Sequence, residues 1–248
     1  MKNNRIQKQT LFLFLILIII SCARDDGSLI YNDPINFKIM PLGDSRVDGS
    51  NSLQGHQSYR YELWKLLAND GVDFDFIGPE IDLTNYPSYL NQTFDSDHAG
   101  FGGYTSANIL NNFTQIIDPN NLPDIVLLGI GGNDLLENIH PQEIIQNIHL
   151  IVDFMQALNP NIIIIIEQIA PGRSTIMTNS LWLALNEFHH QIVALTEQQT
   201  TENSTIISIN MAENWLDSYL ADNVHYSQSG ALLVAQRYYE ALFNFIHN

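Results

Sequence analysis

Short runs of apolar residues recur along the chain at lengths that suit β-strands. The predicted strands cover residues 37–42, 74–77, 124–128, 162–166 and 205–209. The fourth run consists of five consecutive isoleucines, as expected for a strand that is buried on both faces. Because helix-length segments separate most of the runs, the pattern predicts a parallel sheet built from strand and crossover-helix units.

Between the predicted strands, apolar residues recur every three or four positions, which is the spacing of an amphipathic helix. One such stripe begins at Tyr59 and ends before Gly71, and a second begins at Pro141. A third spans 181–195, and the last follows Ser227, a residue suited to an N-cap. The fold class that we expect is therefore α/β: a single α/β/α sandwich domain with a central five-stranded parallel sheet, flavodoxin-like in arrangement.

The N-terminus has a pattern of its own. Three basic residues precede an apolar run at 11–20, and Ser21 and Cys22 follow that run directly. The run is shorter than the roughly 20 residues that a transmembrane helix needs. This layout predicts a signal peptide at residues 1–21.

Cys22 is the only cysteine in the chain, so a disulfide within the chain is impossible. The thiol is then a chance occurrence, a core residue or a point of lipid attachment. The residues before it resemble the bacterial lipobox, which implies that Cys22 is lipidated and becomes the new N-terminus. We therefore expect an exported protein, lipid-anchored to a bacterial membrane in the periplasm or at the cell surface. Residues 22–36 would form a polar tether and residues 37–248 the folded domain.

The chain is strongly acidic, with a formal net charge of −17 from 27 acidic and 10 basic residues. Such a chain lacks a basic surface for a phosphate backbone, so we expect no nucleic-acid partner. Negative charge also repels anionic headgroups, which leaves the lipid anchor as the expected membrane contact and favours a neutral or weakly charged substrate. Solubility alone is an equally simple explanation of the acidity.

Polar residues that could take part in catalysis follow three of the predicted strands, at the sheet edge where ligands bind in such folds. Ser45 stands in a Gly-Asp-Ser turn that exposes its hydroxyl, and Asn133 stands in a Gly-Gly-Asn-Asp loop. An Asn side-chain amide can donate a hydrogen bond to an oxyanion. Asp222 and His225 are three residues apart, so the carboxylate can hold one ring nitrogen while the other accepts the proton of Ser45.

Each of these features also has a purely structural explanation. Gly-Asp-Ser is often only a turn, Asn133 or Asp134 can cap a helix, and an Asp–His pair can be a surface contact. Together, however, the residues supply a nucleophile, a base, a group that orients the base and an oxyanion donor. The combination favours an active site over separate structural roles.

The order of these motifs resembles the SGNH or GDSL hydrolases over about residues 37–245. The resemblance implies that Ser45 is the nucleophile, with its own N–H in the oxyanion hole, and that Asn133 donates from its side chain. It further implies His225 as the base and Asp222 as its partner.

The resemblance also implies that a glycine from a second block of the family completes the oxyanion hole. Within the run HAGFGGYT at 98–105, Gly103 best matches that glycine, and Gly100 and Gly102 are the alternatives.

Several segments are similar to the carbohydrate acetylesterases that remove acetyl groups from xylan. They are MPLGDS at 40–45, DFIG at 75–78, HAGFGGYT at 98–105 and PDIVLL at 123–128. This branch implies an O-acetylated polysaccharide or oligosaccharide as substrate. Two departures are GGND in place of GTND, and Arg46 where isoleucine is commoner. The alternatives are a lipase or thioesterase for longer acyl chains, and a non-catalytic surface protein that binds carbohydrate.

Four more residues lie in the loops that carry the candidate site. We expect Asp44, Arg46, His98 and Asp134 to line the substrate site. The remaining histidines and carboxylates lack the spacing of metal ligands, so we expect neither a metal nor another cofactor. The sequence does not indicate an oligomeric state.

Overall fold

The structure of the chain is a computed structural model that describes residues 36–49 and 57–247. The predicted signal peptide, Cys22 and nearly all of the tether lie outside the described residues, so those assignments stay predictions. Within the described ranges, no helix combines the length and the apolar character needed to cross a membrane.

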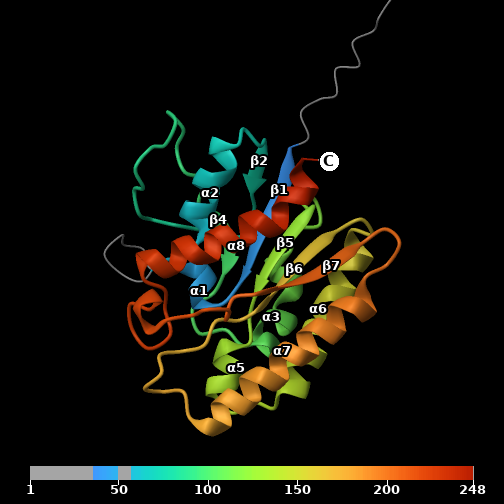
Figure 1. The fold of residues 1–248 in the computed structure, drawn as a ribbon. Coiled ribbons are helices and arrows are strands. Elements are labelled where there is room, and N and C mark those ends of the chain that lie inside the picture. The colour runs from blue at the N-terminus through green and yellow to red at the C-terminus, as the bar shows by residue number, and fades with distance from the viewer. Residues whose placement is uncertain (1–35, 50–56, 248) are drawn as a thin grey trace, which may run out of the picture. The chain divides into compact units, whose positions relative to one another are not determined.

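Parallel strands form the centre of the molecule (Figure 1). They are β2 (Phe74–Phe76), β1 (Phe37–Gly43), β5 (Ile125–Gly129), β6 (Ile163–Gln168) and β7 (Thr205–Asn210), and they lie side by side in this order. All five predicted strands are therefore confirmed, with ends that shift by at most two residues. The order places β1 and β5 next to each other in the middle of the sheet.

The sheet has seven strands in the described residues, not the expected five. The two extra strands, β3 (Glu80–Ile81) and β4 (Asp97–Gly100), lie in the long interval between β2 and the first helix that follows it. β4 pairs in parallel with Leu42 and Gly43 at the end of β1, and β3 pairs with β4 in antiparallel orientation. β3 has only two residues, and β4 begins with Asp97 and His98, so neither produces the apolar run by which the other strands are recognised.

Helices cover both faces of the sheet (Figure 1). α2 (Arg60–Asn69) and α8 (Gln228–Ile246) pack on one face, against Ile39, Leu127 and Ile165. α3 (Ser106–Asn111), α6 (Pro141–Leu158) and α7 (Asn179–Gln199) cover the other, where Leu42 and Leu128 point. The short elements are α1 (Ser45–Asp48), α4 (Phe113–Ile116), α5 (Gly132–Leu136) and the 3₁₀ turn η1 (Asp217–Tyr219). The predicted α/β/α sandwich is therefore confirmed.

The ends of the long helices follow the residues that predicted them. Pro141 occupies the first turn of α6, and the hydroxyl of Ser227 accepts a hydrogen bond from the N–H of Gly230 at the start of α8. Gly71, with φ of +73°, follows the end of α2. The four amphipathic stripes therefore correspond to α2, α6, α7 and α8.

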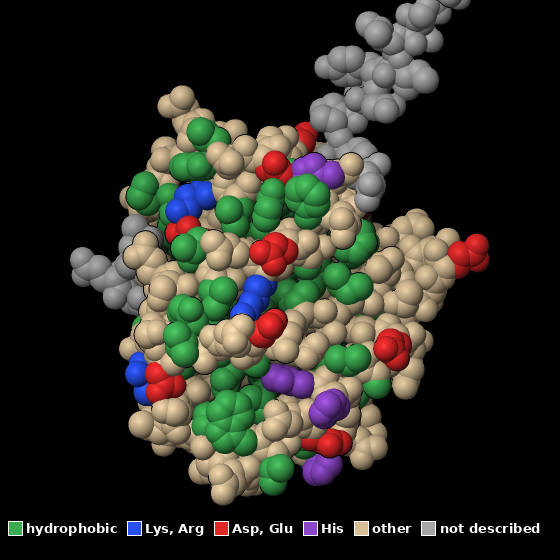
Figure 2. All heavy atoms as spheres, viewed as in Figure 1, with side chains coloured by type: hydrophobic (Ala, Val, Ile, Leu, Met, Phe, Trp, Pro, Cys, Tyr) green, Lys and Arg blue, Asp and Glu red, His purple; other side chains and the backbone are tan. Residues whose placement is uncertain are grey.

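The surface reflects the acidic composition. On the face shown in Figure 2, acidic side chains are scattered among apolar and neutral ones, and the few basic side chains lie apart from one another.

Gly43 allows the central strands to end close together. A Cβ atom at this position would lie 2.0 Å from the carbonyl oxygen of Gly129 and 2.7 Å from a methyl group of Val47. Only glycine fits such an approach between β1 and β5. The two strand ends, which lead directly to Ser45 and to Asn133, are thereby held next to each other.

Candidate active site

Three side chains from two distant parts of the sequence form a continuous chain of hydrogen bonds. Ser45 Oγ lies 2.9 Å from His225 Nε2, and His225 Nδ1 lies 2.7 Å from Asp222 Oδ2. Ser45 is the first residue of α1, directly after β1, whereas Asp222 and His225 belong to the segment between η1 and α8. The arrangement is that of a nucleophile, a base and an orienting carboxylate.

The environment of Asp222 keeps its carboxylate charged. Burial opposes ionisation, but the backbone N–H groups of His225 and Val224 donate to Oδ1, each at 2.8 Å, and the His225 ring lies against Oδ2. Together these interactions hold the pKa of Asp222 well below its usual range. An ionised carboxylate only accepts, so Nδ1 of His225 carries the proton and Nε2 is the acceptor that faces Ser45.

The four-residue helix α1 is held in place by neighbouring side chains. Asp44 caps it by accepting from the N–H of Arg46 at 2.9 Å. From the other side, the fully buried Arg60 donates to the carbonyl oxygens of Val47 and Asp48, each at 2.8 Å. These contacts fix the backbone that carries the Ser45 hydroxyl.

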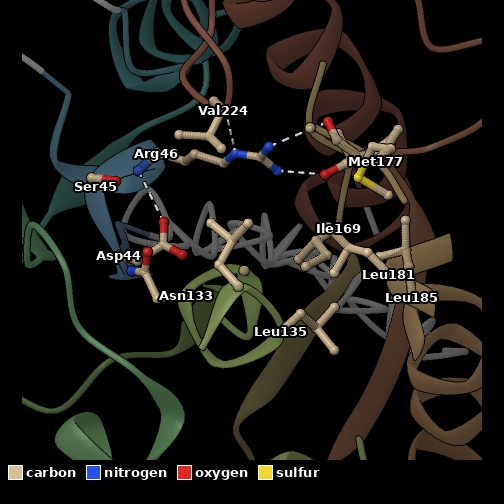
Figure 3. Close-up of a pocket in the computed structure, with 15 residues that line it drawn as sticks. Asp44, Ser45, Arg46, Asn133, Leu135, Ile169, Met177, Leu181, Leu185 and Val224 are labelled. Carbon is tan, nitrogen blue, oxygen red and sulfur yellow. Dashed lines mark hydrogen bonds between the residues drawn. The ribbon is translucent and has the colours of Figure 1, made fainter. Parts of the chain in front are cut away.

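Asn133 is oriented by the neighbouring glycine loop. Its Nδ2 donates to the carbonyl oxygen of Tyr104 at 2.8 Å, and an amide nitrogen carries a second hydrogen. Asn133 and Ser45 both line one pocket (Figure 3). The amide can therefore serve as a fixed donor beside the Ser45 hydroxyl.

The geometry narrows the choice of the loop glycine whose N–H could complete the oxyanion hole. The N–H of Gly100 donates to His98 Nδ1 at 3.0 Å and is buried, so it does not face the site. Gly102 and Gly103 are exposed in the turn that follows, and Gly103 has a φ of +77°, in the region that favours glycine. Of these two, Gly103 remains the better match to the glycine in the second block of the family.

The structure contradicts the expectation that Asp134 lines the substrate site. Its side chain is buried, with 1% exposure, and accepts from the backbone N–H of Ser106 at 2.9 Å and from its hydroxyl at 2.6 Å. The carboxylate thus links α5 to the first turn of α3, and it neither lines the substrate site nor caps its own helix. Burial raises the pKa of Asp134.

The structure also contradicts the expectation that His98 lines the substrate site. It lies on β4 with 2% exposure, and its Nε2 is 3.5 Å from Asp82 Oδ1, which is itself paired with Arg60 at 2.8 Å. A histidine enclosed in this way supports the fold of the 78–103 interval and does not reach the pocket.

Asp44 and Arg46 border the pocket, but their polar groups are engaged by the protein. Asp44 is 5% exposed, and burial raises its pKa even though Arg46 lies beside it. The Arg46 guanidinium donates to the carbonyl oxygens of Val224 and Ala170 at 2.8 and 2.6 Å.

A small pocket, with a cavity volume of about 40 Å³, adjoins Ser45 and Asn133 (Figure 3). Its walls are largely aliphatic: Leu135, Leu136, Ile169, Met177, Leu181 and Leu185. The sequence did not indicate this pocket. Leu185 belongs to the core, as predicted, and is 2% exposed, but it and Leu181 also line the pocket. Apolar periodicity cannot distinguish a side chain that lines a pocket from one that lies wholly in the core. Among the residues that the structure covers, no three His, Cys, Asp or Glu side chains are grouped as metal ligands.

The fold and the similarity to known families and structures together define the class of the protein, that of the carboxylic ester hydrolases with an α/β/α sandwich. The chain belongs to the GDSL-like lipase/acylhydrolase family, whose model matches residues 42–233. The matched range extends from the end of β1 into α8 and includes the whole chain of hydrogen bonds from Ser45 to Asp222.

Individual relatives agree with this assignment. A multidomain esterase of Ruminococcus flavefaciens is 32% identical over 139 residues, which are 50% of this chain but only 18% of that esterase. A carbohydrate esterase family 3 structure from Talaromyces cellulolyticus has a TM-score of 0.71 and 26% identity, covering 85% of this chain and 98% of its own. A family 3 carbohydrate esterase of Clostridium thermocellum has a TM-score of 0.67 and 26% identity, covering 85% and 97%.

Proposed function

We propose that the protein is a serine esterase that works through an acyl-enzyme, with Ser45 as nucleophile. The observation that carries the proposal is the unbroken chain of hydrogen bonds from Ser45 through His225 to Asp222. Each link has the donor and acceptor that the reaction needs, because the Asp222 carboxylate is ionised and leaves Nε2 of His225 as a proton acceptor.

In the first step, Nε2 of His225 takes the hydroxyl proton while Ser45 Oγ attacks the acyl carbonyl carbon. The oxyanion that forms accepts hydrogen bonds from the N–H groups of Ser45 and Gly103 and from the Asn133 amide. When the ester bond breaks, the alcohol leaves with the proton from His225. Water then attacks the acyl-Ser45 ester, again with His225 as base, and releases the acid and the free serine.

The substrate that we favour is an O-acetyl ester on extracellular polysaccharide or oligosaccharide. The two structural relatives described above, at 26% identity, are by name carbohydrate esterases. In addition, the aliphatic walls beside Ser45 suit the methyl group of an acetyl ester.

The same walls favour a second candidate, an esterase for longer acyl chains. Side chains such as Leu181, Leu185 and Met177 extend the apolar surface beyond what an acetyl group needs. Rates on p-nitrophenyl acetate, butyrate and octanoate separate the two. The acetyl proposal expects acetate to be the best substrate, and a clear preference for octanoate would replace it.

We propose further that the protein is exported and anchored through a lipid on Cys22. The sequence before Cys22 supports this placement. Incorporation of labelled palmitate in cells tests it, with Cys22→Ala as the variant expected to lose the label. Equal labelling of the two proteins would contradict the anchor.

The decisive experiment measures acetate release from a panel of acetylated polysaccharides. Ser45→Ala should abolish release, whereas Ser88→Ala, a change at an exposed loop serine that does not line the pocket, should leave it intact. An inactive wild-type protein would remove the catalytic proposal and leave carbohydrate binding as the alternative. An active Ser45→Ala variant would remove Ser45 as the nucleophile.

A further inference from the structure

The residue that follows Ser45 reaches directly to the segment that carries His225. The Arg46 guanidinium donates from Nε to the carbonyl oxygen of Val224 at 2.8 Å, and its central carbon lies 5.1 Å from the centre of the Tyr226 ring. Figure 3 shows the side chain extended from Ser45 across the pocket. Arg46 therefore contacts the neighbours of His225 on both sides.

A second arginine holds the same segment from the loop after β6. Arg173 donates from Nε to the carbonyl oxygen of Asp222 at 3.0 Å and from Nη2 to that of Leu220 at 2.9 Å. Its backbone N–H donates to the carbonyl oxygen of Asn223 at 2.8 Å. As a result, alternate carbonyl groups of the 220–224 segment, those of Leu220, Asp222 and Val224, accept from the two guanidinium groups.

Most of the other hydrogen bonds of this segment are internal to it. Leu220 and Tyr226 form an isolated bridge, the N–H of Ala221 donates to the carbonyl oxygen of His225 at 2.9 Å, and Asp222 Oδ1 accepts from Val224 and His225. The segment has no helix or regular strand, and the Asp222 side chain is 54% exposed, so the two arginines attach this turn to the rest of the protein. A guanidinium group stays charged at all working pH values and presents its donors in a rigid plane. Hydrogen bonds from a charged donor are about twice as strong as neutral ones, so two arginines stabilise one backbone conformation well.

Arg46 also ties the segment to the β6–α7 loop. Its Nη1 donates to the carbonyl oxygen of Ala170 at 2.6 Å, and its Nη2 lies 3.4 Å from that of Pro171. One side chain thus joins the backbone of the nucleophile, the loop after β6 and the backbone of the base. Arg46 thus provides a direct path of contacts from Ser45 to the segment of His225.

We propose that Arg46 and Arg173 are positioning residues that keep His225 Nε2 within hydrogen-bond distance of Ser45. The inference rests on the proposed roles of Ser45 and His225. Misplacing a catalytic group by about 1 Å can cost on the order of a hundredfold in rate. Because neither guanidinium needs to touch the ester, their loss should lower kcat and leave KM nearly unchanged.

The first test compares Arg46→Met and Arg173→Met with Arg237→Met as a matched control. Arg237 also donates to a backbone carbonyl oxygen, that of Glu213, but away from the catalytic segment. On p-nitrophenyl acetate, Arg46→Met should lower kcat by about tenfold to a hundredfold. Arg46→Lys, which keeps the charge but not the planar set of donors, should recover only part of this loss. The control should keep full activity.

A double-mutant cycle shows whether Arg46 acts through His225. In a His225→Ala background, adding Arg46→Met should cost no further activity, because the group that Arg46 positions is already gone. A full additional loss, or a raised KM with kcat unchanged, would overturn the proposal, since Arg46 would then act on the substrate itself.

Hydrogen exchange of the backbone provides a readout that needs no turnover. Arg46→Met and Arg173→Met should speed exchange in peptides covering residues 220–226, and Arg237→Met should not. Unchanged exchange in both variants would overturn the inference even in an active esterase. Faster exchange in a protein without esterase activity would instead support the two arginine contacts while removing the proposed function.

Discussion

At the residue scale, the central candidate residues were predictable because the sheet brings them together. Ser45 follows β1 and Asn133 follows β5, and the carboxyl ends of neighbouring parallel strands lie at one edge of the sheet. The sequence also places Asp222 three residues before His225, which suits the contact that the structure shows. Proximity to a strand end was sufficient information for Ser45 and Asn133, whereas Asp222 and His225, which lie well beyond the end of β7 at Asn210, were indicated by their mutual spacing.

The same reasoning failed for residues whose direction depends on packing. Asn133 and Asp134 are adjacent, but successive residues on a helix point about 100° apart. One side chain therefore borders the pocket, while the other turns to Ser106 in α3. The position of Ser106, 28 residues earlier in the chain, could not be derived from the loop alone.

Asn133 gives a prediction at this scale. Replacing one oxyanion-hole donor in comparable enzymes costs about a hundredfold to a thousandfold in kcat, so Asn133→Ala should fall in this range. The fold should tolerate the change, because the amide makes one hydrogen bond, to the carbonyl oxygen of Tyr104, at a partly exposed position. Steady-state kinetics beside thermal unfolding checks both statements. A variant with wild-type kcat would show that the Asn133 amide does not bind the oxyanion.

At the element scale, predictability followed the apolar content of each segment. β1, β5 and β6 were recognised because each contributes several buried apolar residues, and β2 and β7 because their residues are largely apolar although few are fully buried. β3 and β4 lack this signal, and β4 is ordered by pairing with the end of β1 and by the buried contacts of His98. Such long-range contacts are set by the assembled sheet and leave no local pattern.

Gly43 gives a prediction about the two central strands. In Gly43→Ala, the added methyl group would meet the carbonyl oxygen of Gly129 at 2.0 Å, so β1 and β5 must separate at their ends. We expect a loss of about 1–3 kcal/mol or more in the free energy of unfolding, together with lower kcat, because Ser45 moves relative to Asn133.

Urea denaturation and kinetics on the same preparation measure both effects of Gly43→Ala. Gly71→Ala is the matched control, since Gly71 has a positive φ but nothing lies within 4 Å of an added Cβ. That control should lose about 1–2 kcal/mol through backbone strain and keep its kcat. Equal kcat in Gly43→Ala and the wild type would contradict the proposed link between strand spacing and catalysis.

At the scale of the whole molecule, buried charged residues stabilise the loops around the site. Arg60 and Asp82 form an ion pair with side chains 1% exposed, and Arg60 also donates to the carbonyl oxygens of Val47 and Asp48 behind Ser45. These partners are 12 to 22 residues apart, so neither composition nor periodicity indicated them. The α/β sandwich was predictable from apolar patterns, but its internal polar contacts were not.

Glu167 is the buried carboxyl whose ionisation should affect the stability of the whole fold. It is 2% exposed near the end of β6, and Tyr238 donates to its Oε1 at 2.7 Å. Burial raises the pKa of Glu167 to about 7, although the Tyr238 hydroxyl and the charge of Arg46 oppose the shift. The folded state thus binds this proton more tightly than the unfolded chain, whose pKa is 4.5.

The stability that this proton contributes is fully present below pH 4.5 and is lost as the pH rises to about 7. Glu167→Gln cannot ionise, so its free energy of unfolding should fall less between pH 5 and pH 8 than that of the wild type. The shift implies a difference of up to about 3 kcal/mol between the two proteins at pH 8.

Urea denaturation at both pH values measures this difference, with the exposed Glu202→Gln as control. Burial also raises the pKa of Asp95 to about 6, so part of the slope should persist in Glu167→Gln. Identical slopes in wild type and Glu167→Gln would show that Glu167 is already ionised in the folded protein at pH 5.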